Sequence, residues 1–329
     1  MDGRWRIVRM LMVAMGVTLF AILVWRNDPA ALLHSIRQLS WRLLIVVAFP
    51  FPLVNALDTL GWRFAFRRDR VPFRALFLAR LAGEAFNVTT PTASVGGEPV
   101  KAWLVRRHIA FDESFPSVII AKTTVTIAQG LLLIVGLVCA WHLLPHDSPL
   151  LSAMVWLLIA EIVAVGAFVA VQVAGLLGNG GRALGRFRFL ARLAGGLGRL
   201  DDSLATFYRR EPVRLMLSVS FHFLGWLASA LEVWVILNLL GVEISFGAAT
   251  LIEAFSTAVR FATFMLPAGI GVLEGGHVAM FSALGLGAAT GLSFSLVRRI
   301  REATWIGVGL VVLATVRNLA PTPAAAAPG

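Results

Sequence analysis

Six segments of this chain are each long and apolar enough to cross a lipid bilayer as a helix. They lie at about 7–25, 43–62, 115–142, 150–177, 213–240 and 302–318. A membrane-spanning helix needs about 20 mainly apolar residues, and hydrophobic residues make up 58% of the 329 residues here, charged residues only 14%. At a mean hydropathy of +0.81, the chain carries more apolar surface than a soluble domain of this length can bury. The sequence therefore predicts an all-α integral membrane protein, with a single membrane domain over residues 1–329.

Two further apolar regions, 75–108 and 247–290, are interrupted by proline and glycine. In each, a proline is followed seven residues later by a glutamate, with glycines between them. The pairs are Pro91 with Glu98, and Pro267 with Glu274. We expect each region to form a broken or re-entrant helical hairpin. In a membrane chain, such broken segments in matching halves point to a polar site near the bilayer midplane.

The arginines predict how the segments are oriented. They cluster before the first segment, after the second (63–74) and within residues 178–212. Because basic loops stay on the cytoplasmic side, we expect the N-terminus to be cytoplasmic and 178–212 to be a basic cytoplasmic loop. The connections 142–149 and 241–245 contain no lysine or arginine, which suits the outer face.

With this orientation, and if both interrupted regions are re-entrant, they fall in units of opposite topology, residues 43–142 and 213–318. The distance from mid-span to the key proline is 39 residues in the first unit and 41 in the second, counted from Pro52 to Pro91 and from Trp226 to Pro267. This spacing supports an inverted repeat, an architecture common among secondary transporters. However, Arg298, Arg299 and Arg301 would then lie on the outer side, so hairpins that cross the membrane fully are an alternative.

Ionisable residues lie deep inside the apolar segments, and they predict a polar interior because each costs about 2.5–3.5 kcal/mol to insert. These residues are Asp58, Glu84, Lys122, Glu161, Glu232, Glu253, Arg260 and Glu274. The secondary candidates for substrate binding among them are Asp58, Glu84, Lys122 and Glu253. Asp58 could instead form a pair at the end of its span with Arg63, one turn away. Glu161 and Glu232 either pair with a neighbouring helix or take a direct part.

The first interrupted region carries the clearest candidate site. Gly96 and Gly97 would let the backbone approach a ligand closely, and a helix beginning near Glu98 would offer amide groups to phosphate. Glu98 and Lys101 share one helix face. With Asn87 nearby, they could bind a zwitterionic or anionic headgroup, or form an ion pair that opens when substrate arrives. The alternative is that the glycines permit tight packing and the pair is a plain salt bridge.

The second interrupted region repeats this pattern. Arg260 precedes the key proline by seven residues, Glu274 aligns with Glu98, and His277 aligns with Lys101. Histidine titrates near neutral pH, so His277 could couple transport to protons, or it could be a packing residue. The predicted substrate-binding set is Asn87, Gly96, Gly97, Glu98, Lys101, Arg260, Glu274 and His277. No catalytic residue, metal ligand or cofactor is predicted.

Basic residues elsewhere indicate contact with lipid. Within 183–210, leucine and phenylalanine recur at helical spacing among arginines, which indicates either a helix on the anionic inner leaflet or a solvated linker. The net charge of +11 fits the positive-inside pattern and anionic inner-leaflet lipids better than nucleic acid. The tail, 320–329, is rich in alanine and proline and is expected to be disordered.

The residues at the two breaks resemble a known family. Segments 83–87 and 96–101 in the first break, and 266–276 in the second, are similar to the flippase-like membrane domain of lysylphosphatidylglycerol synthases and its stand-alone relatives. The resemblance covers nearly the whole chain. The Gly-Val-x-Glu-Gly-Gly form of the second break is also similar to a subgroup associated with hopanoid lipids.

The resemblance implies a bacterial inner-membrane protein that moves a lipid between leaflets. By position, Glu98 and Glu274 match the family's acidic residues. Lys101 stands where arginine is more usual, so bidentate phosphate recognition is not implied there. The aminoacyl-transferring domain of the full synthases has no counterpart in this sequence, so we do not expect synthesis of aminoacylated lipid.

The leading hypothesis is therefore a lipid translocator, not an enzyme, whose partner is a membrane lipid with a polar or anionic headgroup. One alternative is a membrane-embedded lipid-modifying enzyme. Enzymes that use metal-bound nucleotide-lipid donors need clustered aspartates, and the nearest candidate is the isolated Asp201 and Asp202. Another alternative is a non-catalytic subunit that anchors lipid-synthesis enzymes.

Overall fold

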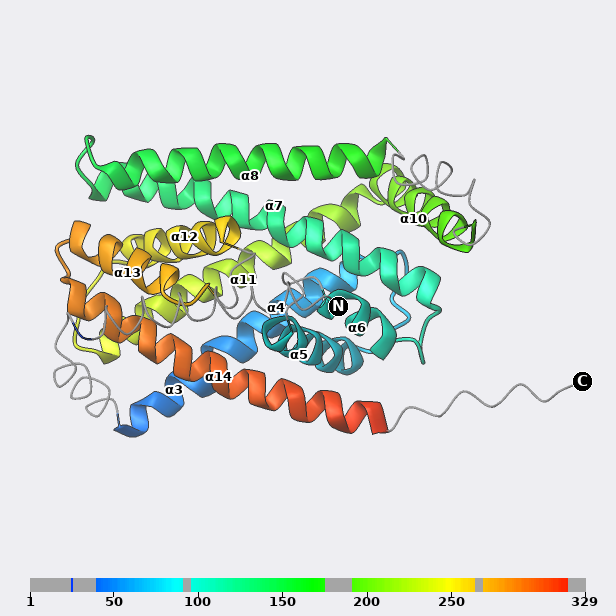
Figure 1. Ribbon diagram of the computed structural model, residues 1–329, viewed down its shortest axis with the longest axis horizontal. Helices are drawn as coiled ribbons and strands as arrows, with labels where there is room; N and C mark the ends of the chain where they lie inside the picture. Colours follow the sequence, from blue (N-terminus) through cyan, green and yellow to red (C-terminus); the bar gives the residue numbers. More distant parts are fainter. Residues whose placement is uncertain (1–24, 26–39, 91–95, 175–190, 264–268, 319–329) are drawn as a thin grey trace, which may run out of the picture.

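The computed structural model describes residues 25, 40–90, 96–174, 191–263 and 269–318, and every regular element among them is helical (Figure 1). In chain order the elements are the short 3-10 helix η1 (Ser40–Arg42), α3 (Leu43–Ala48), α4 (Pro50–Phe64), α5 (Phe73–Thr89), α6 (Gly97–Leu104), α7 (Phe111–Leu143), α8 (Pro149–Val173), α10 (Ala191–Arg210), α11 (Pro212–Leu239), α12 (Phe246–Ala262), α13 (Val272–Ala283) and α14 (Ala288–Asn318).

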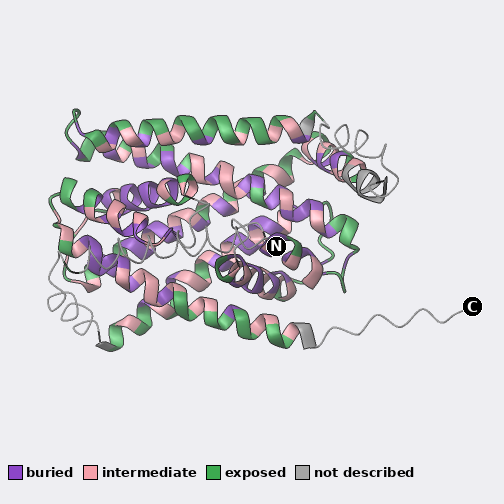
Figure 2. Cartoon of the chain, viewed as in Figure 1, coloured by how far each residue is buried: buried purple, intermediate pink, exposed green. Residues whose placement is uncertain are grey.

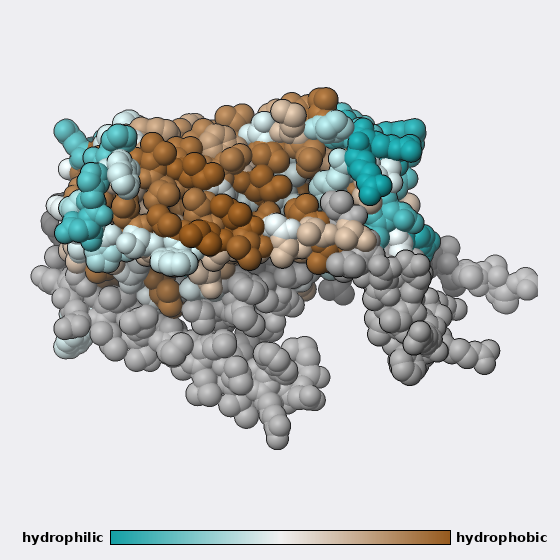
Figure 3. All heavy atoms as spheres, turned by 90° about the horizontal axis from the view of Figure 1, so that it is seen from above, coloured by the Kyte–Doolittle hydropathy of each residue, from teal (hydrophilic) through white to brown (hydrophobic). Residues whose placement is uncertain are grey.

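Among the residues that the structure describes, four helical spans are long and apolar enough to cross a membrane. These are Leu43–Phe64, Phe111–Leu143, Pro149–Gln172 and Pro212–Leu239. These confirm four of the predicted segments, whereas predicted span 7–25 lies outside the described residues apart from Trp25. Figure 3 shows a broad apolar band between two hydrophilic ends of the molecule. The protein is thus a multi-pass membrane protein.

The last predicted span, 302–318, is only the C-terminal part of a longer helix. α14 begins at Ala288, and its first half contributes Leu292, Phe294 and Val297 to the core, each fully buried. The arginines at 298, 299 and 301 therefore lie within a packed helix. They do not lie in a connection that precedes the last predicted span.

Both interrupted regions form two helices separated by a break, as predicted. α5 and α6 make up the first hairpin, α12 and α13 the second, and the prolines Pro91 and Pro267 lie outside the described residues. In the second break, Gly269 and Gly271 have φ angles of 58° and 83°, a left-handed backbone that glycine adopts without steric cost. Ser245 caps α12 by accepting a hydrogen bond from the Ala248 amide, at 3.1 Å.

Each hairpin packs against a long helix from the other half of the chain. α4 packs against α11, while α5 packs against α14 and α12 packs against α7. Each exchanged contact depends on a glycine, because a Cβ on Gly309 would lie 2.6 Å from the Leu81 carbonyl oxygen, and one on Gly136 would lie 2.2 Å from Ala254 Cβ. In Figure 1, α5 and α6 lie toward the end of the long axis where α10 lies, and α12 and α13 lie toward the opposite end.

Among the described residues, buried apolar side chains form two clusters, one around each hairpin. Figure 2 shows buried positions on the helices at both ends of the long axis. The cluster around α5 and α6 includes Trp62, Leu76, Ala102, Leu204 and Phe207. The last two come from α10, which packs against α7 and α8. Residues 191–210 of the predicted basic cytoplasmic loop 178–212 are thus helical, as the spacing of leucine and phenylalanine in 183–210 suggested, and Leu204 and Phe207 pack in the folded body; residues 175–190 lie outside the described part of the chain.

Candidate functional site

A chain of alternating charges links the two helices of the first hairpin to α7. Lys101 Nζ donates to Glu84 Oε1 at 2.6 Å and to Glu98 Oε2 at 3.1 Å. Lys122 Nζ lies 3.7 Å from Glu98 Oε1. Lys101 and Glu98 are buried, whereas the Lys122 side chain is 47% exposed. The predicted Glu98–Lys101 pair therefore exists, but as the centre of a larger network.

Asn87 and Gly97 hold the first hairpin together. Asn87 Oδ1 accepts a 2.6 Å hydrogen bond from the Gly97 amide, and Asn87 Nδ2 lies 3.5 Å from Glu98 Oε1. A Cβ on Gly97 would lie 2.1 Å from the Gly83 carbonyl oxygen. Gly97 therefore allows α6 to pack closely on α5, which is the structural alternative considered for this residue. Its neighbour Gly96 is the N-cap residue of α6.

Asp58 forms a second polar contact at the interface of α4, α5 and α11. Its Oδ2 accepts from Arg80 Nη2 at 2.6 Å, and its Oδ1 accepts from His222 Nδ1 at 2.8 Å. Arg63, considered as its partner from the sequence, pairs instead with Asp69 at 3.5 Å. Asp58 thus joins the two halves of the chain.

The second hairpin carries a chain of the same chemical kind. Arg299 Nε donates to Glu274 Oε1 at 2.8 Å, and Arg299 Nη1 donates to Glu302 Oε2 at 3.1 Å. Arg260 Nη1 reaches Glu302 Oε1 at 3.4 Å, and its side chain is 50% exposed. Glu274 also caps α13, because its Oε2 accepts from the Gly271 amide at 2.7 Å.

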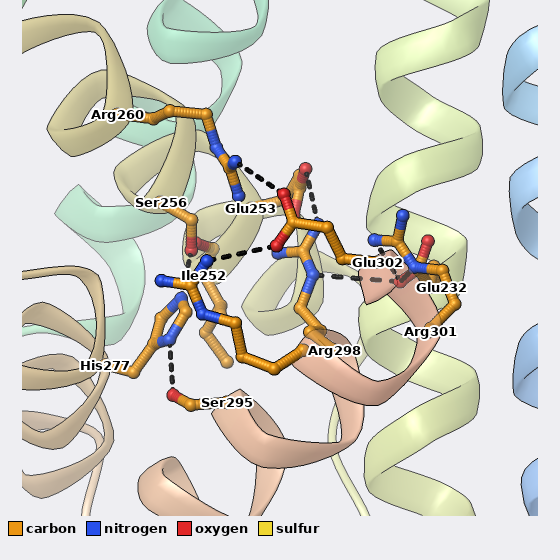
Figure 4. A network of polar contacts seen from close by, with 11 residues as sticks. Glu232, Ile252, Glu253, Ser256, Arg260, His277, Ser295, Arg298, Arg301 and Glu302 are labelled. Atoms are coloured by element: carbon orange, nitrogen blue, oxygen red, sulfur yellow. Dashed lines mark hydrogen bonds and ion pairs between the residues drawn. The ribbon is translucent and has the colours of Figure 1, made fainter. Parts of the chain in front are cut away.

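Three further ion pairs extend this second cluster, one of them between Arg298 Nε and Glu232 Oε1 at 3.7 Å (Figure 4). Arg298 donates to both oxygens of Glu253, at 2.7 and 3.2 Å. Arg301 contacts Glu232 Oε1 through Nε at 3.0 Å and through Nη2 at 2.8 Å. α14 is thereby tied to α11 and α12 by planar, charge-assisted contacts, the geometry for which arginine is suited.

His277 lies between two serines. Its Nε2 is 2.8 Å from Ser256 Oγ and its Nδ1 is 2.7 Å from Ser295 Oγ (Figure 4). Both hydroxyls also lie within hydrogen-bond distance of backbone carbonyl oxygens, those of Ile252 and Gly291. Each hydroxyl has one proton, and a neutral imidazole donates through one nitrogen only. With a neutral ring, one serine must turn its proton to His277; with a protonated ring, both serines keep their bonds to the backbone.

The structure does not gather the predicted residues into one site. Glu98 and Lys101 belong to the first cluster, Arg260 and Glu274 to the second, and no hydrogen bond or ion pair joins the clusters within the described residues. The clusters also contain residues outside the predicted substrate-binding set: Arg80, His222, Glu232, Arg298, Arg299, Arg301 and Glu302. Several of these come from the Arg-Arg-Ile-Arg-Glu stretch at 298–302. Extending the last predicted span back to residue 288 would have placed that stretch inside the last helix.

Comparisons with known proteins match the chain to a family of membrane proteins. The family described as the lysylphosphatidylglycerol synthase TM region matches residues 10–311. A UPF0104 membrane protein of Methanothermobacter thermautotrophicus is 25% identical over 312 residues, which cover 88% of this chain and 90% of the relative. The UPF0104 membrane protein PH1989 of Pyrococcus horikoshii is 23% identical over 333 residues, covering 94% and 96%.

No solved protein structure gave a significant match. The family match nevertheless includes both hairpins, both charged clusters and the helices that hold them. The chain belongs to the family of the lysylphosphatidylglycerol synthase transmembrane region.

Proposed function

We propose that this protein is a lipid translocator that moves a polar-headgroup lipid between the two leaflets. The observation that carries the proposal is the pair of buried charged clusters, each reaching a half-exposed cation, inside an apolar shell. Charged residues at membrane depth are costly, and those that are kept mark functional features such as substrate or ion pathways and proton relays. Each cluster belongs to one hairpin, and the hairpins lie toward opposite ends of the long axis (Figure 1).

The proposal includes re-entrant hairpins in an inverted repeat. α6 has 8 residues and α13 has 12, lengths of about 12 and 18 Å at 1.5 Å per residue. Neither length spans a hydrocarbon core of about 30 Å. Both units also run in the order of one long span, two shorter helices and one long helix: Leu43–Phe64, α5, α6 and α7 in the first unit, and α11 to α14 in the second.

The proposal places the α10 end of the molecule in the cytoplasm. Described connections at that end, 65–72 and 105–110, contain arginines, whereas 144–148 and 240–245 at the other end contain none. Positive-inside topology then puts the N-terminus in the cytoplasm. The family resemblance points to the inner membrane of a bacterium. Anionic inner-leaflet lipids would contact the basic end, and lipid-synthesis enzymes are proposed partners.

In the proposed mechanism, the headgroup enters a cluster by taking over contacts that the protein makes with itself. The half-exposed cations Lys122 and Arg260 meet the headgroup first, and the buried carboxylates Glu98 and Glu274 hold the network behind them. The acyl chains stay in lipid, and the two units rock to expose the headgroup to the other leaflet. Translocation requires no covalent chemistry, so we propose that the protein is not an enzyme.

The test is transbilayer movement of a tail-labelled phospholipid in vesicles that contain the full-length protein. Glu98→Gln and Glu274→Gln each remove charge-assisted contacts inside a cluster, and we expect each to slow movement by about tenfold. Glu113→Gln is the matched control, because Glu113 is exposed and lies 4.0 Å from its nearest cation, Arg70. Movement at the normal rate in both cluster variants would remove these glutamates from the mechanism.

A further inference from the structure

The charges of each cluster balance. In the first chain, the carboxylates of Glu84 and Glu98 alternate with the ammonium groups of Lys101 and Lys122. The second chain alternates in the same way, with Glu274, Arg299, Glu302 and Arg260 in order. The remaining ion pairs add equal numbers of both signs: Asp58 with Arg80, Glu253 with Arg298, and Glu232 with Arg301. Neither cluster carries a surplus charge to attract a headgroup of net charge.

In both chains of alternating charges, the longest contact is the one to the outer, half-exposed cation. Glu98 holds buried Lys101 through Oε2 at 3.1 Å, while its Oε1 lies 3.7 Å from Lys122. Glu302 holds Arg299 through Oε2 at 3.1 Å, while its Oε1 lies 3.4 Å from Arg260. We call Glu98–Lys122 and Glu302–Arg260 the terminal pairs. Both exceed the 2.7–2.9 Å typical of strong charge-assisted hydrogen bonds, and the cation of each is about half exposed.

We propose that the terminal pairs are headgroup sites for a zwitterionic phospholipid. The phosphate of the headgroup binds the cation of the pair, and its ammonium group binds the carboxylate oxygen that the cation has released. This inference rests on the proposed translocation function and names its substrate class. Replacing one internal ion pair by the two charges of such a headgroup leaves every group paired. An anionic headgroup would instead leave Oε1 of Glu98 or of Glu302 without its outer cation, while Oε2 stays bound to Lys101 or Arg299. A cationic headgroup would leave Lys122 or Arg260 without its carboxylate oxygen.

The geometry of Glu98 and Glu302 supports the replacement of the outer cation by the ammonium group of a headgroup. Glu98 and Glu302 are each fixed through one oxygen by a cation three residues away on the same helix, so the second oxygen stays in place when the outer cation turns toward a phosphate. Because one terminal pair belongs to each hairpin, a headgroup released by one cluster finds the same order of charges at the other. The two sites therefore need no change in substrate preference across the membrane.

Three tail-labelled phospholipids with identical acyl chains test this inference in vesicles that contain the full-length protein. Their headgroups are phosphoethanolamine (zwitterionic), phosphoglycerol (anionic) and lysyl-phosphoglycerol (net cationic), each at trace level in the same phosphatidylcholine background. We expect the zwitterionic probe to move about tenfold faster than the other two, because each of these leaves one charge unpaired.

Charge variants should shift this preference in opposite directions. Glu302→Gln gives its cluster a surplus positive charge, so the rate of the anionic probe should rise about tenfold relative to the zwitterionic probe. Lys122→Gln leaves a surplus negative charge and should favour the cationic probe instead. Lys122 is half exposed, so this variant is expected to fold even if a substitution in the buried network does not. Arg70→Gln removes an exposed arginine outside both clusters and should leave the preference unchanged.

A binding measurement separates this inference from the function on which it rests. Native mass spectrometry of the protein released from bilayers of equal phosphatidylethanolamine and phosphatidylglycerol should show the zwitterionic lipid retained, and Lys122→Gln should reduce that retention. If no probe moves faster than in protein-free vesicles, translocation is wrong and the binding measurement alone decides the substrate class. If probes move but the anionic or cationic one leads, if all three move equally, or if neither variant alters their order, the zwitterionic assignment is overturned while translocation stands.

Discussion

At the scale of single residues, Glu161 differs from the other carboxylates inside the protein. It is 1% exposed on α8, and neither carboxylate oxygen has a hydrogen-bond partner among the described residues. An unpaired carboxylate in an apolar interior takes up a proton, because burying the bare charge costs far more. By contrast, the buried glutamates of the two clusters each contact a cation.

This difference predicts opposite responses to the same substitution. Glu161→Gln replaces a neutral acid by a neutral amide, so we expect the free energy of unfolding to change by less than about 1 kcal/mol. Glu232→Gln breaks buried contacts with Arg298 and Arg301 and should cost about 3 kcal/mol. Thermal unfolding in detergent measures both, and equal losses for the two variants would show that Glu161 is ionised and paired.

Asp69, in the connection between α4 and α5, predicts a pH dependence outside the membrane-spanning helices. Burial alone would raise the pKa of this carboxyl, but Arg214, at 2.6 Å, and Arg63 outweigh it and hold the pKa below 3.8. Its contribution to stability is therefore fully present above pH 3.8 and is lost as the pH falls through the lowered pKa.

The corresponding variant is Asp69→Asn. The pair is partly exposed, so we expect a loss of at most about 1 kcal/mol at neutral pH. The difference from the unaltered protein should shrink as the pH is lowered from 5 to 3 in thermal unfolding scans. A difference that grew on acidification would show that the two arginines do not lower the pKa of Asp69.

The sequence predicted which residues are polar at depth, but not their partners. Asp58 and Glu84 stood out because a charge in an apolar segment is costly and must be compensated. Asp58 meets Arg80 and His222 rather than Arg63, since Arg80 lies on another helix and His222 is 164 positions away along the chain. Local spacing identifies pairs within one helix, such as Glu98 with Lys101, and cannot identify pairs that tertiary packing creates.

At the scale of elements, α14 shows how a charged stretch can belong to a membrane helix. Residues 298–302 interrupt its apolar pattern, so hydropathy places the start of the helix too late. The helix nevertheless begins at Ala288, because the arginines in this stretch form ion pairs with carboxylates from α11, α12 and α13. Compensation by neighbouring helices, which hydropathy does not register, decides where this helix begins.

The exchanged contacts between hairpins and long helices predict a contrast within α14. Gly309→Ala places a methyl group 2.6 Å from both the Leu81 carbonyl oxygen and Ala85 Cβ, so α5 must move and stability should fall by about 1–3 kcal/mol. Gly307→Ala, on the same helix, meets nothing within 4 Å and should be neutral or slightly stabilising. Unfolding temperatures compare the two, and equal values would show that α5 does not pack on α14 through Gly309.

At the scale of the whole molecule, the two ends of the apolar band differ in charge, and this predicts which side each end faces. In a Cys139→Ala background, the sole native cysteine is removed, and single cysteines replace exposed Arg67 at the α10 end or exposed Asp147 at the opposite end. A membrane-impermeant maleimide should label Asp147→Cys in intact cells, and Arg67→Cys only after permeabilisation. The reverse pattern would invert the proposed orientation.

The sequence by itself determined that this protein lies in lipid, and it determined the local architecture. Apolar length requires helices in lipid, because only hydrogen bonds within a helix satisfy its backbone there, and proline with glycine marks both hairpin breaks. Tertiary structure decided the rest: the packing of each hairpin on a helix from the other half, the packing of α10 against α7 and α8, and the two separate clusters in place of one site. The physical reason is that a charge in hydrocarbon requires a partner but does not specify one, and only the packing of distant helices brings a particular partner within reach.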